Sequence, residues 1–191
     1  VDSHDYAPDC APENQRFALG QDVWADNLSL IFTFRGIPTL FYGSEIEFQK
    51  GKMIDVGPNS PLSQTGRAYF GTHLEGTVTA TNFGVYTASG TVANTLNHPL
   101  AQHIRRLNMI RRSIPALQKG QYSRDGVSGG LAFKKRFTSG TVDSFVLVTI
   151  SGDSNFSGIP NGTYRDAITG DVQNVTNGSL YVSCSGKGNA R

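Results

Sequence analysis

The stretch GIPTLFYGSE, residues 36–45, decides the fold predicted for this chain. Its centre, Ile37 to Tyr42, is a continuous run of mostly apolar residues with a glycine on each side, Gly36 and Gly43. A strand that is apolar on both faces is typical of a parallel sheet, because helices cover both faces of such a sheet. We therefore expect a buried parallel strand here, within an α/β domain.

A helix is predicted upstream of this strand. Between Glu13 and Phe34, apolar residues recur at helical spacing, and Gly36 follows at a position typical of a helix C-cap. The pattern therefore predicts a helix from near Glu13 to Phe34, packed against the buried strand.

A second helix is predicted to begin at Pro99, after a cap at Asn97 or His98, and to end before Pro115. One apolar stripe runs along it: Leu100, Ile104, Leu107, Ile110 and Ile114. Its arginines are assigned to the solvated face, since no glycine-rich loop accompanies them as a phosphate site would require: Arg105, Arg106, Arg111 and Arg112. Residues 44–95, between the strand and this helix, show weak periodicity, and we expect a segment of that length to form part of a binding surface.

After Gly120 the hydrophobic pattern changes to the period of two that strands require. The predicted strands are Leu131 to Phe137, Ser144 to Ile150, Gly162 to Ala167 and Ser179 to Cys184. Turn signals such as Asn-Gly separate them. We expect a small all-β sandwich over residues 119–191, following an α/β domain over residues 1–118.

Composition narrows the class of protein. The chain has 191 residues, 38% of them hydrophobic, and a formal net charge of +2. Neither sign of charge is concentrated in a run, so neither nucleic acid nor a membrane is expected as a partner. The high content of Gly, Ser, Thr and Asn suggests a secreted protein, and five N-x-S/T sequons could accept glycans in a eukaryotic secretory route: Asn27, Asn155, Asn161, Asn174 and Asn177. Whether Cys10 and Cys184 pair is left open.

The first residues, Val-Asp-Ser-His-Asp, carry the strongest chemical signal. If they end a parallel strand, His4 and Asp5 lie at the carboxyl edge of the sheet, where α/β barrels assemble their sites. A carboxylate beside an imidazole can stabilise positive charge, act as a base or bind a metal. The short pattern alone leaves these three roles open, together with a structural turn.

The order of these segments resembles the α-amylase family of glycoside hydrolases and transglycosidases over nearly the whole chain. VDSHD resembles the family's fourth signature block, at the end of barrel strand seven, and GIPTLFYGSE resembles strand eight. Residues 97–120, with R-x-x-x-P-A-L, resemble the last barrel helix and the entry to the C-terminal domain. The resemblance implies the C-terminal portion of a TIM (β/α)8 barrel, strands 7 and 8 with their helices, followed by an all-β Greek-key sandwich.

Several site residues are implied by the resemblance. Asp5 matches the third catalytic carboxylate, which stabilises an oxocarbenium-like transition state, and His4 matches the neighbouring substrate-binding histidine. Tyr6 is a candidate for stacking on a sugar ring, with a packing role as the alternative. Asp55 is a candidate subsite residue.

The sequence departs from the family pattern at other positions. Where relatives carry an arginine after that aspartate, this chain has Asn59, and Arg67 lies farther on. Glu45 and Glu47 are expected to be structural, bonding loop backbone or residues at the barrel end. No metal ligands are assigned here.

A retaining mechanism needs a nucleophile and an acid/base carboxyl about 5 Å apart, and the family places both on earlier strands that this sequence does not contain. We therefore expect the chain to be inactive by itself and to require the N-terminal part of the barrel as its partner. No cofactor is expected in this chain, although calcium is possible in the complete enzyme.

The resulting expectation is part of a secreted, extracellular α-amylase that hydrolyses internal α-1,4-glucosidic bonds of starch and maltooligosaccharides with retention. Two alternatives remain: a cyclodextrin-forming or other α-glucan transglycosylase of the same family, and a non-catalytic carbohydrate-binding module.

Overall fold

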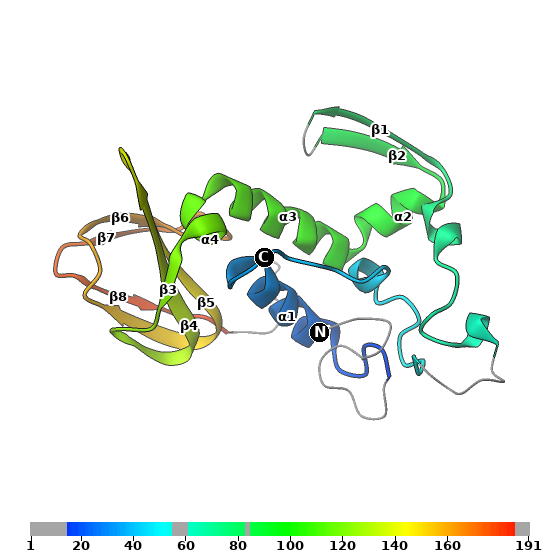
Figure 1. Ribbon diagram of the computed structural model, residues 1–191, viewed down its shortest axis with the longest axis horizontal. Coiled ribbons are helices and arrows are strands. Elements are labelled where there is room, and N and C mark those ends of the chain that lie inside the picture. Colours follow the sequence, from blue (N-terminus) through cyan, green and yellow to red (C-terminus); the bar gives the residue numbers. More distant parts are fainter. Residues whose placement is uncertain (1–14, 55–60, 83–84, 186–191) are drawn as a thin grey trace. The chain divides into compact units, whose positions relative to one another are not determined.

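The computed structural model describes residues 15–54, 61–82 and 85–185 (Figure 1). The chain falls into two compact units. The first unit consists of Val1–Asn27 and Thr39–Arg106, and the second consists of Leu28–Pro38 and Leu107–Arg191. Helices α1 (Gln21–Thr33) and α3 (Pro99–Ser113) contribute residues to both units. The fold is mixed α/β, and every strand pairing among the described residues is antiparallel. The predicted domain boundary after residue 118 stays a prediction.

The first unit combines helical turns with one β-hairpin. Besides parts of α1 and α3 it contains η3 (Ser44–Ile46), η4 (Leu62–Gln64), η5 (Gly71–Leu74), β1 (Thr77–Asn82), β2 (Val85–Ser89) and α2 (Thr91–Asn97). Its core is built on Trp24, which is 1% exposed and packs edge-on against Phe17 with ring centroids 5.7 Å apart. The indole Nε1–H donates to the carbonyl of Ser44 at 2.9 Å, so α1 is tied to the turn that follows the 36–45 motif.

The expected parallel strand does not form. Residues 37–41 have no strand pairing, and Ile37 is 91% exposed. A parallel strand depends on hydrogen bonds from neighbours on each side, and among the described residues no strand runs beside this segment, nor does any barrel close. The prediction of a buried strand of a TIM barrel is therefore wrong for the part of the chain that is described; Phe41 and Tyr42 instead join an aromatic cluster.

The first helix is shorter than predicted. It begins at Gln21 rather than near Glu13, because Gln15 pairs as an antiparallel bridge with Met53 and Phe17 takes a left-handed conformation, φ 51°. Its C-terminal end is close to the expected place, and Gly36 has φ 87°, a value that glycine adopts readily.

The second helix agrees with its prediction. It begins at Pro99, and the ring Nδ1 of His98 accepts a hydrogen bond from the backbone N–H of Leu100 at 3.3 Å, which caps the first turn. It ends at Ser113, and Pro115 opens a short helix, α4 (Pro115–Lys119). The predicted start, cap and stop are confirmed.

The hairpin β1–β2 lies in a segment for which no regular structure was predicted. Residues paired directly across an antiparallel ladder share a face, so the pairs Thr77–Ser89 and Thr79–Thr87 place four hydroxyl residues on one side. Tyr86, on the other side, accepts a hydrogen bond from Gln102 at 3.1 Å through its hydroxyl. The hairpin therefore carries four hydroxyl residues on one face and is joined to α3 through Tyr86.

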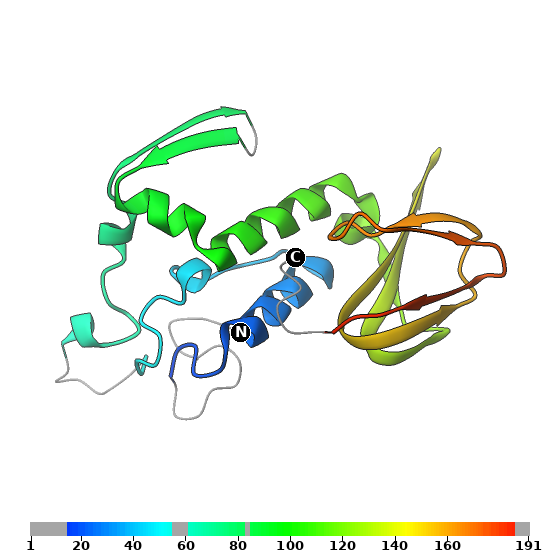
Figure 2. The ribbon, with the colours of Figure 1, turned by 180° about the vertical axis from the view of Figure 1, so that it is seen from behind.

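The second unit contains a four-stranded sheet in the order β3-β4-β5-β8 and a two-stranded sheet, β6-β7 (Figure 2). The strands are β3 (Gln121–Ser123), β4 (Val127–Ser139), β5 (Val142–Ser157), β6 (Gly162–Arg165), β7 (Val172–Val175) and β8 (Ser179–Val182). Four of them overlap the strands predicted from the period-two pattern: β4 and β5 are longer than predicted, and β6 and β8 each end two residues earlier. The short β3 and β7 were not predicted.

The middle of the β4–β5 ladder is covered on both faces, while both of its ends carry exposed residues. On one face, Phe133, Val148 and Ile150 pack with Leu117 of α4 and with partly buried residues that include Leu30 of α1 and Ile110 of α3. On the other, Phe156 packs with Val175 and neighbouring residues of β6–β7. Helices and a second sheet thus cover opposite faces of one ladder.

Two cations, the buried Lys135 and the half-buried Arg111, bind backbone carbonyls at the end of α1. Lys135 is 2% exposed, and its Nζ donates to the carbonyls of Phe34 and Leu117, both at 2.8 Å. Arg111 donates to the carbonyls of Phe32, Gly36 and Leu117 at 2.8–3.0 Å. The assignment of Arg111 to a solvated face is therefore wrong: carbonyls at a helix C-terminus carry partial negative charge and bind cations.

Candidate functional site

The residues predicted to form the site, His4, Asp5, Tyr6 and Asp55, all lie outside the described residues. Their roles stay predictions. The described residues that border these segments are nevertheless neighbours, since Gln15 forms an antiparallel bridge with Met53. The backbone that leads away from the His4–Asp5 block is thereby joined to the backbone that leads toward Asp55.

Arg16 is the centre of this junction. Its side chain is fully buried and donates through Nη1 to the carbonyl of Gly66 at 3.1 Å and through Nη2 to the carbonyl of Tyr42 at 3.0 Å. Its backbone N–H donates to the carbonyl of Lys52 at 2.9 Å, and its carbonyl accepts from Gly51 at 2.6 Å. One residue therefore connects the 15–17 segment, the 36–45 motif and the 51–53 and 65–68 segments.

Aromatic rings surround the Arg16 guanidinium. Its carbon lies 4.9 Å from the ring centroid of Phe17, 5.1 Å from that of Phe41 and 5.9 Å from that of Phe48. Cation–π attraction is strongest where water is excluded, as it is around a side chain with no exposed surface. The motif at residues 36–45 thus supplies rings as well as a carbonyl to this arginine.

The same rings continue into a larger aromatic cluster. Phe48 and Phe70 meet edge to face with centroids 5.1 Å apart, and His73 stacks on Phe70 at 5.2 Å. The Tyr42 hydroxyl donates to the carbonyl of Ala68 at 3.2 Å, and 36% of Tyr42 is exposed. The Tyr42 ring contacts those of Phe41, Phe48 and Phe70, so this tyrosine lies at the exposed edge of the cluster.

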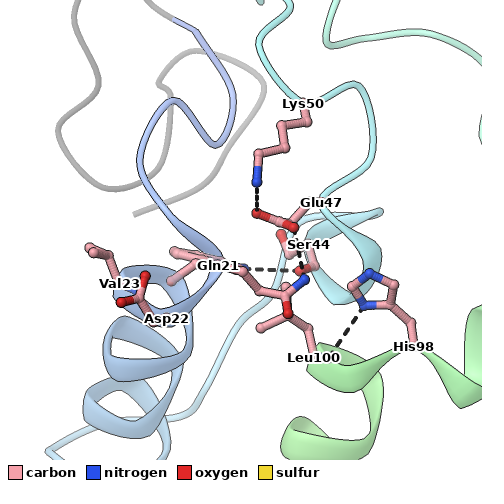
Figure 3. A network of polar contacts seen from close by, with 9 residues as sticks. Gln21, Asp22, Val23, Ser44, Glu47, Lys50, His98 and Leu100 are labelled. Carbon is pink, nitrogen blue, oxygen red and sulfur yellow. Dashed lines mark hydrogen bonds and ion pairs between the residues drawn. The ribbon is translucent and has the colours of Figure 1, made fainter. Parts of the chain in front are cut away.

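Glu47 makes structural contacts, but with two side chains rather than with the loop backbone or barrel-end residues that were expected (Figure 3). Its carboxylate accepts a hydrogen bond from the Gln21 side-chain amide at 2.9 Å and pairs with Lys50 at 2.6 Å. Its backbone has φ 52°, so the turn is held in a left-handed conformation. Figure 3 also shows the cap of α3 at His98 beside this turn. The expectation for Glu45 and for Arg67 stays a prediction.

The first unit also contains a buried histidine, His103. His103 is 4% exposed, and its Nε2 lies 3.1 Å from the carbonyl oxygen of Ala25. Burial lowers the pKa of His103, and Arg106 lowers it further, while the contact with Ala25 and the charge of Asp26 act in the opposite direction. The histidine is therefore neutral over most of the physiological range.

The described residues form a scaffold, with no metal centre among them: they hold no group of three or more His, Cys, Asp or Glu side chains placed to bind an ion. No helix in the described ranges has the length and hydrophobicity that a membrane crossing requires. The sequence reasoning did not identify Arg16, because nothing in a linear pattern distinguishes a buried arginine from a solvated one; the nearby phenylalanines are the only signal.

Comparison with known proteins finds a distant relative. No protein-family model matches the chain. Over 98% of its length, the chain is similar to a protein named Beta/alpha-amylase from Paenibacillus polymyxa, with 24% identity over 197 residues. The similarity spans 14% of the length of that protein. The chain is therefore amylase-like in sequence, and it corresponds to a small portion of the relative.

Proposed function

We propose that this sequence belongs to a secreted, extracellular glycoside hydrolase that cleaves internal α-1,4-glucosidic bonds of starch and maltooligosaccharides with retention of configuration. The observation that supports it most is the similarity to a Beta/alpha-amylase over 98% of the chain. The succession of the VDSHD block, the GIPTLFYGSE motif and a C-terminal β unit supports the same proposal. In it, the chain supplies the end of a catalytic barrel and a following β-sandwich of Greek-key type.

Asp5 is the proposed catalytic residue of this chain. A carboxylate that binds the sugar hydroxyls at the cleaved subsite stabilises the positive charge that develops at the anomeric carbon. His4 is proposed to bind the same sugar, with Tyr6 and Asp55 in adjacent subsites. The nucleophile and the acid/base carboxyl belong to the preceding part of the barrel in this proposal.

The described scaffold fits this arrangement. The Gln15–Met53 bridge and the bonds of Arg16 fix the backbone from which both proposed site segments extend. Catalytic groups need support of this kind, because small displacements of a reacting group are costly to rate. Arg16 thus has a positioning role in the proposal, whereas Asp5 acts on the substrate.

The test is Asp5→Asn in the longest secreted form of the protein that contains this sequence, with Asp125→Asn, an exposed turn residue, as the matched control. The proposal predicts a loss of starch hydrolysis of about two to three orders of magnitude for Asp5→Asn, with unchanged folding, and full activity for the control. Retention of most activity in Asp5→Asn would favour a carbohydrate-binding module instead. Cyclic products from soluble starch would favour the transglycosylase.

A further inference from the structure

Asn155 lies on the outer face of the β4–β5–β8 sheet. Its neighbours along β5, Ser154 and Phe156, have no exposed surface, whereas Asn155 is exposed, as strand alternation requires. The register pairs it with Ser128 on β4 and with Tyr181 on β8. Residues paired directly across antiparallel strands have Cβ atoms about 4.5–5.5 Å apart and share a face. Asn155 and Tyr181 are therefore immediate neighbours, and both are exposed.

Tyr181 presents a fixed apolar ring beside Asn155. The side chain is 53% exposed, a large fraction for a tyrosine on a sheet. Its hydroxyl donates to the Asp153 carboxylate at 2.5 Å, and that carboxylate also accepts from Ser183 at 3.1 Å and from the backbone N–H of Cys184 at 2.8 Å. The hydrogen bond from Tyr181 is the main reason that the pKa of Asp153 is lowered. The ring is thus held at its hydroxyl end, and about half of the residue stays exposed.

Asn155 also begins a sequon, Asn155-Phe-Ser157. The other sequons differ in their surroundings. Asn27 lies inside α1, where the helix occupies the backbone on both sides. In three others, the carboxamide oxygen accepts a hydrogen bond: that of Asn161 from Gly178, that of Asn174 from Thr163 and that of Asn177 from Ser179. Among the sequons that the structure describes, Asn155 alone is paired across the ladder with an exposed aromatic ring.

We propose that Asn155 carries an N-linked glycan whose first sugar packs on the Tyr181 ring. The donor is a polyprenyl-diphosphate-linked oligosaccharide that begins with an N-acetylhexosamine. The Asn155 Nδ2 forms a bond to the anomeric carbon as the bond from that carbon to the diphosphate oxygen breaks. The polyprenyl diphosphate leaves with the bonding electrons, and Nδ2 loses one proton to the transferase.

The neighbouring ring gives the glycan a structural role. The C–H face of a pyranose is apolar and matches an aromatic face, so the sugar covers surface that Tyr181 otherwise exposes to water. A glycan is bulky and requires an exposed position, which the outward face of β5 provides. The proposal rests on the secretion proposed above and is independent of starch hydrolysis.

The first test is site mapping on protein collected from the culture medium of its native source. Treatment with a peptide N-glycosidase in heavy-oxygen water converts each glycosylated Asn to a labelled Asp. We expect the label at Asn155, and an unlabelled Asn155 in secreted protein would overturn the proposal. If the protein is found only inside the cell, the proposed localisation is contradicted, and the glycan proposal fails with it. Starch hydrolysis by the same sample tests the proposed function separately.

The second test concerns the packing on Tyr181. Trimming the glycan of the wild type to its first sugar should leave the Tm of the secreted protein unchanged. In the Tyr181→Ser variant, removal of that first sugar should leave the Tm of the variant unchanged as well, because the ring on which the sugar packs is already gone. In the wild type, full removal should lower the Tm by about 2–4 °C. Tyr69→Ser, on an 80% exposed tyrosine of the first unit, is the matched control and should retain the full effect of glycan removal. An equal effect in Tyr181→Ser and the control would contradict the packing.

Discussion

Replacement of Lys135 by methionine should destabilise the second unit. Lys135 is 2% exposed, and its ammonium group donates to two carbonyls at 2.8 Å, those of Phe34 and Leu117. Methionine keeps the aliphatic packing and removes both hydrogen bonds. Leu117 keeps its hydrogen bond from Arg111 at 3.0 Å, so the main loss falls on the carbonyl of Phe34.

The magnitude follows from two opposing contributions. A hydrogen bond with a charged donor contributes about 1.5–3 kcal/mol, and a buried carbonyl without its donor costs about 1–3 kcal/mol. Against this, burial lowers the pKa of Lys135, as does the charge of Arg111, so removal of the ammonium group relieves a desolvation penalty. We expect a net loss of about 1–3 kcal/mol, which moves a urea midpoint down by about 0.5–1.5 M.

The assay is urea unfolding followed by circular dichroism, with Lys134→Met as the matched control. Lys134 is the next residue along β4, and its side chain projects from the opposite face of the strand. The control should remain within about 0.5 kcal/mol of the wild type. Equal midpoints for the two variants, or a more stable Lys135→Met, would refute the reasoning that these bonds stabilise the end of α1.

Three further predictions concern other parts of the molecule. Burial lowers the pKa of His103, so its contribution to stability is present at pH values above the ordinary pKa of histidine and is lost as the pH falls below that pKa. His103→Gln should therefore make the free energy of unfolding depend less on pH between about pH 7 and pH 5. An unchanged pH dependence would contradict this. The pKa of Asp153 is lowered mainly by the hydrogen bond from Tyr181, so the folded state loses stability as the pH falls below about 4 and this carboxylate is protonated. Asp153→Asn should lose less stability over that pH range than the wild type. Acid titration of the folded protein measures the difference. Gly76→Ala should be clearly more destabilising than Gly36→Ala in thermal unfolding: both glycines have positive φ, but a Cβ at Gly76 would collide with the Ser89 carbonyl, whereas a Cβ at Gly36 meets open space. Equal costs would refute the β1–β2 geometry.

Local signals in the sequence were reliable where a local cause determines the structure. The limits of α3 followed from a proline that suits only the first turn and a second proline that cannot continue the helix. The long strands β4 and β5 followed from their period-two pattern. In both cases the residues of the element itself predict its presence. For α3 they also predict both ends, whereas β4 and β5 extend beyond the predicted strands, Leu131 to Phe137 and Ser144 to Ile150.

Predictions that depended on distant partners were less successful. The apolar run at residues 37–42 is compatible with a buried strand, but a strand needs neighbours, and the described chain uses Phe41 and Tyr42 in an aromatic cluster instead. Arg111 looked solvated because a linear pattern does not show the carbonyls of Phe32 and Gly36 that it binds from far along the chain. The buried cation of Arg16 was missed for the same reason.

The central claim is the proposal that this sequence serves retaining hydrolysis of starch. It is tested most directly by proton NMR of the first products that the longest form of the protein containing this sequence releases from soluble starch. The account predicts linear maltooligosaccharides that appear first as the α-anomer and slowly mutarotate. Products that appear first as the β-anomer, or no release of sugar by folded protein, would contradict it.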